Sequence, residues 1–172
     1  GPELAEALLR EEEAEKRIRV RQGMAALSDF TPSFSRAQQE VRDHLARVLE
    51  EAGLTPPKMA ELVDLVEARG EEELEAILGV MALEGTVVGL DTDFFMDSRV
   101  LGSAGARVVE ELGGQRNLGP ADFKSVLPIS RRHLLPLLRH FDLVGITTRL
   151  GEGRDVADSL PPEWGSLGLP RC

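Results

Sequence analysis

Apolar residues recur at intervals of three and four along most of residues 35–144, which is the spacing of helices that bury one face. In the first half of this stretch the pattern predicts helices over about 35–52, 58–66 and 71–84. The alternating stretch TVVGLDTDFFM that follows predicts two short strands joined at residues 91–93. The predicted order is therefore helix, helix, helix and hairpin.

The same order of elements repeats sixty residues further along the chain. Amphipathic patterns predict helices over 98–112, from Pro120 onward and over 130–144, and ITTRLGEGRDV predicts a second hairpin. At this offset the core positions coincide: Leu74 falls on Leu134, Ile77 on Leu137, Leu78 on Leu138 and Gly85 on Gly145. Three helices followed by a β-hairpin make a winged helix, a helix-turn-helix variant whose third helix usually meets nucleic acid. The repeat predicts a mainly α fold with small β-hairpin wings, arranged as tandem winged-helix domains.

These patterns divide the chain into four segments. Residues 1–30 predict a helix and a hairpin, the end of a preceding winged helix. Residues 31–97 are predicted to form an acidic winged-helix domain and residues 98–158 a basic one. Residues 159–172, rich in Pro and Gly, are predicted to form an irregular tail.

Composition narrows the possible functions. The chain has one cysteine, Cys172, so a disulfide framework and a thiolate metal cluster are excluded. His133 and His140 lack the further ligands of a metal site, and no catalytic triad or phosphate-binding glycine loop can be assembled. There is no apolar run long enough to cross a membrane and no recognisable signal peptide. We therefore expect a cytoplasmic protein without a metal or cofactor in this chain and without catalytic activity of its own.

Charge is unevenly distributed along the chain. The net charge is −10, from 20 Lys and Arg against 30 Asp and Glu. Residues 116–154 nevertheless hold seven basic and three acidic side chains, a local charge of +4. Because nucleic-acid binding needs cationic surface, this part of the chain is the candidate for it.

The third helices of the two repeats begin with opposite charges. Residues 71–73 are all Glu, and they align with Arg131, Arg132 and His133 in the second repeat. A helix N-terminus carries partial positive charge, so acidic residues stabilise it and arginines do not. The arginines therefore call for a role other than helix stability.

The second hairpin adds two further arginines. Arg149 is expected on the strand face opposite Ile146 and Leu150, and Arg154 follows the Gly-Glu-Gly tip. An arginine fork can grip a phosphate at two points or stack on an unpaired base. Although single surface arginines are often only solvated, four at the same helix and hairpin ends predict a nucleic-acid site.

The stretch FKSVLPISRRHLLPLLRHFDLVGITTRLGEGR, residues 123–154, resembles the last winged-helix domain of the bacterial selenocysteine-specific elongation factor, a translational GTPase. The shared features begin with a short helix that contains a Phe and a next helix that starts with Ser, Arg and a second basic residue. They continue with a Leu-Pro-Leu-Leu run, an Asp, a Gly and a wing that carries arginines. FTPSFSRAQQEVRDHLARVLEEAGLTPP, residues 30–57, resembles the preceding winged helix of that factor. The resemblance extends over about residues 15–156.

This resemblance implies a function for the chain. In that family the C-terminal winged helices bind the selenocysteine insertion hairpin of mRNA, so that selenocysteinyl-tRNA is delivered at a UGA codon. Carried over to matching positions, the RNA contacts are Arg131, Arg132, Arg149 and Arg154, with Lys124 as a weaker candidate. The family further implies a longer protein that binds GTP, the ribosome and selenocysteinyl-tRNA. We also expect a monomer and no membrane partner.

Two other functions are compatible with tandem winged helices. A DNA-binding transcription regulator would more often be dimeric and carry a longer basic stripe along the third helix, which here only Arg139 extends. A protein-interaction scaffold would use its winged helices without nucleic acid, as the acidic first repeat is suited to do.

Overall fold

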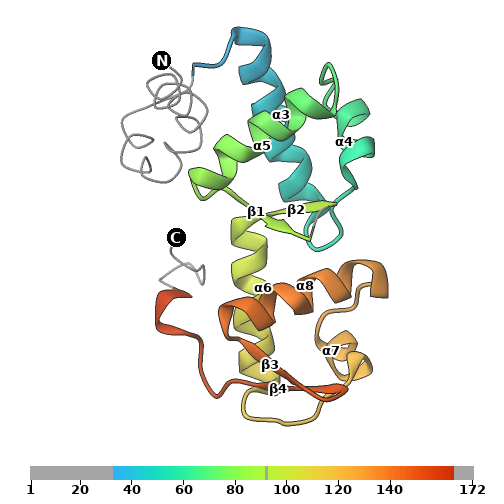
Figure 1. Cartoon of the computed structure of the whole chain (residues 1–172), viewed down its shortest axis with the longest axis vertical. Helices are drawn as coiled ribbons and strands as arrows, with labels where there is room; N and C mark the ends of the chain where they lie inside the picture. The colour runs from blue at the N-terminus through green and yellow to red at the C-terminus, as the bar shows by residue number, and fades with distance from the viewer. Residues whose placement is uncertain (1–32, 92, 165–172) are drawn as a thin grey trace, which may run out of the picture. The chain divides into compact units, whose positions relative to one another are not determined.

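The computed structural model describes residues 33–91 and 93–164, so the helix and hairpin predicted within residues 1–30 lie outside the described residues. The first domain contains three helices and an antiparallel hairpin (Figure 1). Its elements are α3 (Arg36–Ala52), α4 (Met59–Leu65), α5 (Glu71–Leu83), β1 (Val87–Leu90) and β2 (Phe94–Asp97). In the hairpin Val87 lies opposite Asp97, and Leu90 lies opposite Phe94.

The second domain repeats this order directly after β2. Its elements are α6 (Ser98–Leu112), α7 (Pro120–Val126), α8 (Arg131–Val144), β3 (Thr147–Leu150) and β4 (Gly153–Val156). Thr147 lies opposite Val156 and Arg149 opposite Arg154, and an isolated bridge from Leu118 pairs with the other edge of β4. The tandem winged-helix fold predicted from the sequence is confirmed.

Local signals in the sequence set the ends of the helices. Asp97 caps α6, because its Oδ1 accepts hydrogen bonds from the backbone N–H groups of Arg99 at 2.8 Å and Val100 at 3.1 Å. Gly145 ends α8 in the left-handed conformation with φ of 88°, which glycine adopts without steric cost. Gly85 has the same role after α5, with φ of 83°.

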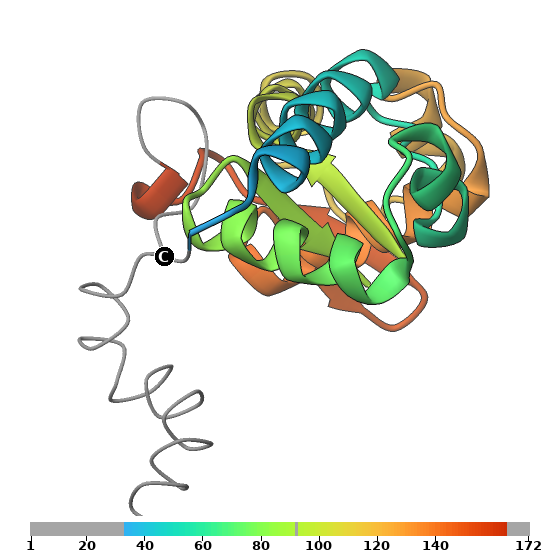
Figure 2. The ribbon, with the colours of Figure 1, turned by 90° about the horizontal axis from the view of Figure 1, so that it is seen from above.

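The first hairpin is shared between the cores of the two domains. The helices of the first domain bury their own apolar faces, including Leu45, Leu74 and Ile77, all 0% exposed. Three residues of the hairpin, Leu90, Phe94 and Met96, pack in one cluster with the apolar side chains of the second domain. The hairpin lies over α8, as both ribbon views show (Figures 1 and 2).

The chain after β4 returns to the second domain, at the start of the segment for which an irregular tail is predicted. Residues Pro162–Trp164 form a 3-10 turn, and Trp164 is 1% exposed. Its indole lies against Gly105 of α6, where a Cβ would come within 2.5 Å of the ring and 2.7 Å of Ile146. The Pro- and Gly-rich composition gave no sign of this contact, which depends on a small residue 59 positions away in the sequence.

No helix among the described residues is long and apolar enough to cross a membrane.

Candidate nucleic-acid interface

The first turn of α8 presents two arginines to solvent. Ser130 precedes the helix in an extended conformation, and its carbonyl accepts from the N–H groups of His133 at 3.1 Å and Leu134 at 2.9 Å. Ile129 and Leu134 on either side of Ser130 are buried, which fixes the angle at which the chain enters the helix. Arg131 and Arg132 are both exposed, and neither forms an ion pair with a described carboxylate.

The corresponding turn of α5 has the opposite electrostatics. Glu71 and Glu72 are exposed there, and the Glu73 carboxylate accepts from the Arg69 backbone N–H at 3.0 Å and from its guanidinium at 2.7 and 2.9 Å. Hydrogen bonding from the Arg69 side chain, together with its charge, holds the pKa of Glu73 below its ordinary value. The start of α5 is therefore anionic and would repel phosphate.

Arg149 lies on the second hairpin, as the sequence predicted. It is exposed on β3, and its Nε donates to the carbonyl of Gly151 in the turn at 3.5 Å. Directly opposite residues of an antiparallel pair share a face, so Arg149 shares the face of β3 and β4 that carries Arg154.

The placement of Leu150 corrects an expectation from the sequence. Leu150 was expected to share a buried face with Ile146, yet it is 57% exposed while Ile146 is 0% exposed. Of the residues of β3 only Thr147 is buried, so the strand leaves the core before its last residue. An exposed apolar side chain next to Arg149 was therefore not expected from the sequence.

Arg154 is not available for RNA, and this corrects its assignment as a contact residue. It is 6% exposed, and its guanidinium bonds both oxygens of Asp142 on α8, Nε to Oδ1 at 3.0 Å and a terminal nitrogen to Oδ2 at 2.9 Å. Thr147 donates its hydroxyl proton to the same carboxylate. Because β4 is paired on both edges and its arginine is held by Asp142 of α8, the side chain is enclosed where the sequence suggested an exposed wing tip.

Two other basic residues differ in whether their charge is free to contact nucleic acid. Lys124 is exposed in the last turn of α7 and forms no ion pair with a described residue. Arg139 on α8 is bound to Asp91 of the first hairpin, with 2.8 Å between guanidinium and carboxylate. The only arginine that could lengthen the basic stripe along α8 is therefore partly neutralised.

Four exposed basic residues come from elements on one side of the second domain. In Figure 1 the first turn of α8, helix α7 and the turn between β3 and β4 lie on the same side of that domain. We call the four residues Arg131, Arg132, Arg149 and Lys124 the basic surface. None of these four residues lies within ion-pair distance of a described carboxylate.

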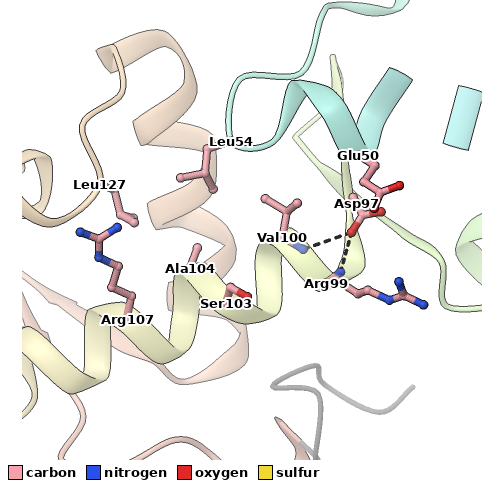
Figure 3. Close-up of a pocket in the computed structure, with 9 residues that line it drawn as sticks. All are labelled: Glu50, Leu54, Asp97, Arg99, Val100, Ser103, Ala104, Arg107 and Leu127. Carbon is pink, nitrogen blue, oxygen red and sulfur yellow. Dashed lines mark hydrogen bonds between the residues drawn. The ribbon is translucent and has the colours of Figure 1, made fainter. Parts of the chain in front are cut away.

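A groove of about 310 Å³ lies along α6, and its lining includes none of these residues (Figure 3). Its apolar lining consists of Leu54, Val100, Ala104 and Leu127. Its charged lining is balanced, two carboxylates against two arginines, and comprises Glu50, Asp97, Arg99 and Arg107. Asp97 is occupied as the cap of α6, and the groove does not add to the basic surface.

No group of three or more His, Cys, Asp or Glu residues suited to a metal ion occurs in the described part of the chain. His133 bonds the Pro56 carbonyl through Nε2 at 3.0 Å, and its ring lies 4.9 Å from that of Phe94. His140 is half-buried, and its Nε2 has no hydrogen-bond partner among the described residues.

Burial of His140 makes the stability of the second domain sensitive to acid. Desolvation lowers the pKa of His140 from its ordinary value of 6.5, so the unfolded chain binds the proton first as the pH falls. The free energy of unfolding therefore keeps its full value above about pH 6.5 and decreases below that pH, because protonation of His140 then favours the unfolded chain. We expect the thermal midpoint to fall between about pH 7.5 and pH 5.5, and His140→Leu to reduce that fall. An unchanged pH dependence in His140→Leu would contradict this.

The described residues define a tandem winged-helix protein whose second domain carries the basic surface. Residues 110–155, which span most of that domain, match the family model described as "Elongation factor SelB, winged helix". This match confirms, for residues 110–155, the resemblance seen in the sequence.

Similarity to known proteins extends over more of the chain. The chain is 21% identical over 124 residues to the selenocysteine-specific elongation factor of Desulfomicrobium baculatum, covering 72% of this chain and 19% of that protein. Two solved structures share the fold. The mRNA-binding domain of elongation factor SelB from E. coli, in complex with SECIS RNA, has a TM-score of 0.61 and 21% identity over 73% of this chain and all of that one. The bacterial selenocysteine-specific elongation factor EF-Sec has a TM-score of 0.56 and 19% identity over 74% of this chain and 20% of that one. The chain spans about a fifth of the length of the curated relative.

Proposed function

We propose that this chain is the mRNA-binding part of a selenocysteine-specific elongation factor. Its second winged helix binds the selenocysteine insertion hairpin, so that the whole factor delivers selenocysteinyl-tRNA at a UGA codon. The observation that carries the proposal is the exposed Arg131-Arg132 pair at the start of α8, inside the segment that matches the SelB winged helix.

The proposal gives each residue of the basic surface a role. Arg131 and Arg132 bind phosphate oxygens, because anions are favoured beside a helix N-terminus and a guanidinium binds them with two parallel hydrogen bonds. Arg149, with the exposed Leu150 beside it, provides a guanidinium plane and an apolar surface for an unpaired base. Lys124 adds a weaker phosphate contact from α7.

RNA suits this surface better than duplex DNA. The major groove of an A-form helix is too deep and narrow for a recognition helix, so RNA is read at loops and bulges. A short cationic turn and a hairpin tip match such a target. A DNA reader needs side chains along the helix, where Arg139 is instead held by Asp91.

The remaining functions belong to the longer protein. GTP binding, contact with the ribosome and binding of selenocysteinyl-tRNA are assigned to parts of the factor other than this chain. The chain itself is assigned no catalysis and no cofactor, and it acts as a monomer in the cytoplasm.

A binding experiment tests the proposal. Affinity is measured for a selenocysteine insertion hairpin, the same stem with a scrambled loop, and a DNA duplex of equal length, each at two salt concentrations. We expect a preference for the hairpin that persists at the higher salt, since purely electrostatic binding weakens steeply. Equal binding of all three that vanishes with salt would contradict RNA recognition, and stronger binding of the duplex would support a DNA-binding regulator.

Single substitutions then locate the site. Arg131→Ala, Arg132→Ala and Arg149→Ala should each weaken hairpin binding about tenfold without a change in helical content, because each removes a charged contact. Arg36→Ala is the matched control, since Arg36 also lies in a first helical turn, that of α3, and its side chain is 94% exposed. A loss with Arg36→Ala equal to that with Arg131→Ala would mean that net charge, and not the basic surface, decides affinity.

A further inference from the structure

The first turn of α8 is held by the first domain. Phe94, the first residue of β2, is 5% exposed, and the guanidinium carbon of Arg132 lies 5.8 Å from its ring centroid. The ring of His133, the next residue, lies 4.9 Å from the same ring at an interplanar angle of 49°. One aromatic residue of the acidic domain thus contacts two consecutive residues of the turn that carries the basic surface.

Two polar contacts anchor the same helix. The His133 ring bonds the carbonyl of Pro56 at 3.0 Å, and because a carbonyl only accepts, Nε2 is the donor. Further along α8, Arg139 binds Asp91 in the turn of the first hairpin at 2.8 Å. The first hairpin and the loop before α4 therefore hold α8 at its first turn and again six residues later.

We propose that Phe94 is a positioning residue for RNA binding, which orders the Arg132 side chain before RNA arrives; this rests on the proposed function above. A free arginine side chain has many rotamers, and a ligand must restrict them when it binds. A guanidinium over an aromatic face is already restricted, and the cation–π attraction leaves its N–H edge free to donate to phosphate. The acidic domain therefore contributes to RNA affinity without contacting RNA.

A double-mutant cycle tests this role. Phe94→Met keeps the apolar volume but removes the aromatic face, and should weaken hairpin binding about three- to fivefold, the size of an exposed cation–π contact. In an Arg132→Ala background the same substitution should have no further effect, because the side chain that it positions is absent. Affinities are compared at a temperature at which every variant is folded.

Phe95→Met is the matched control. Phe95 is the next residue of β2, is half-buried, and packs over Gly89 of β1, with 3.4 Å between its ring and the position of a Gly89 Cβ. Adjacent residues of a strand point to opposite faces, so this ring is directed away from that of Phe94. Phe95→Met should leave hairpin affinity unchanged.

The affinities of these variants distinguish failure of the positioning role of Phe94 from failure of the proposed RNA binding. An unchanged affinity in Phe94→Met, or an equal loss with and without Arg132, overturns the positioning role while the proposed function stands. Absence of any hairpin preference in the unsubstituted protein overturns the proposed function instead. Should Phe94→Met not fold, NMR relaxation of the arginine Nε–H groups in the unsubstituted, RNA-free protein decides. Greater order at Arg132 than at Arg131 supports the inference, and equal order overturns it.

Discussion

Arg154→Ala is expected to lower the free energy of unfolding by about 3 kcal/mol. The substitution leaves the Asp142 carboxylate without its cationic partner in a largely enclosed site, and removal of one member of a buried pair is strongly destabilising. The figure is at the low end of the usual range because the Asp142 side chain keeps 23% of its exposure. Urea denaturation followed by fluorescence measures it, since the one tryptophan, Trp164, is buried in the same domain.

Arg116→Ala is the control for this prediction. Arg116 also pairs with an aspartate of β4, Asp155, at 3.0 Å, but its side chain is 77% exposed, so its loss should change stability by about 0–1 kcal/mol. If Arg154→Ala kept full stability and lost hairpin affinity instead, Arg154 would be an RNA contact, as its position in the sequence first suggested.

Trp164→Ala is expected to lower the free energy of unfolding by about 3–5 kcal/mol. Trp164 is among the largest fully buried side chains among the described residues, and its removal leaves a cavity beside Gly105 and Ile146. Circular dichroism in urea measures the loss, because the substitution removes the fluorescent probe. A chain ended after residue 158 should lose a similar amount.

Leu143→Ala is the control on the surface of the same domain. Leu143 lies in the last turns of α8 and is 84% exposed, so its truncation should change stability by less than about 0.5 kcal/mol. A small effect of Trp164→Ala, comparable to that of Leu143→Ala, would show that the turn after β4 is not part of the folded domain in solution.

Two arginines at facing positions of the second hairpin are expected to have different roles, one in RNA binding and the other in the stability of the domain. Arg149 and Arg154 lie directly opposite each other on β3 and β4. Arg149 is exposed near the turn, whereas Arg154 is enclosed between Leu118, Thr147 and Asp142. Substitution of the first is expected to reduce hairpin affinity at constant stability, and substitution of the second to reduce stability.

The acidic first domain supports helix α8 of the second domain. Its helix α5 begins with anionic residues, so it does not offer a second phosphate site. Its hairpin instead packs on α8 and binds Arg139 through Asp91. The charge difference between the repeats thus accompanies a difference in role, since one repeat supports and the other presents the basic surface.

The sequence by itself determined the repeated winged-helix fold, the helix ends at Gly85 and Gly145, and the exposed arginines at the start of α8. These features depend on local properties: periodicity over one helix, a cap, and a charge next to a helix end. Only the tertiary structure decided that Arg154 is enclosed by Asp142, that Trp164 returns to the core, and that Phe94 lies under Arg132. Each of these contacts joins residues at least 12 positions apart, and one apolar or charged residue does not reveal which distant partner it will meet. That choice is made by packing, where the space beside Gly105 or the carboxylate of Asp142 accepts one side chain and excludes others.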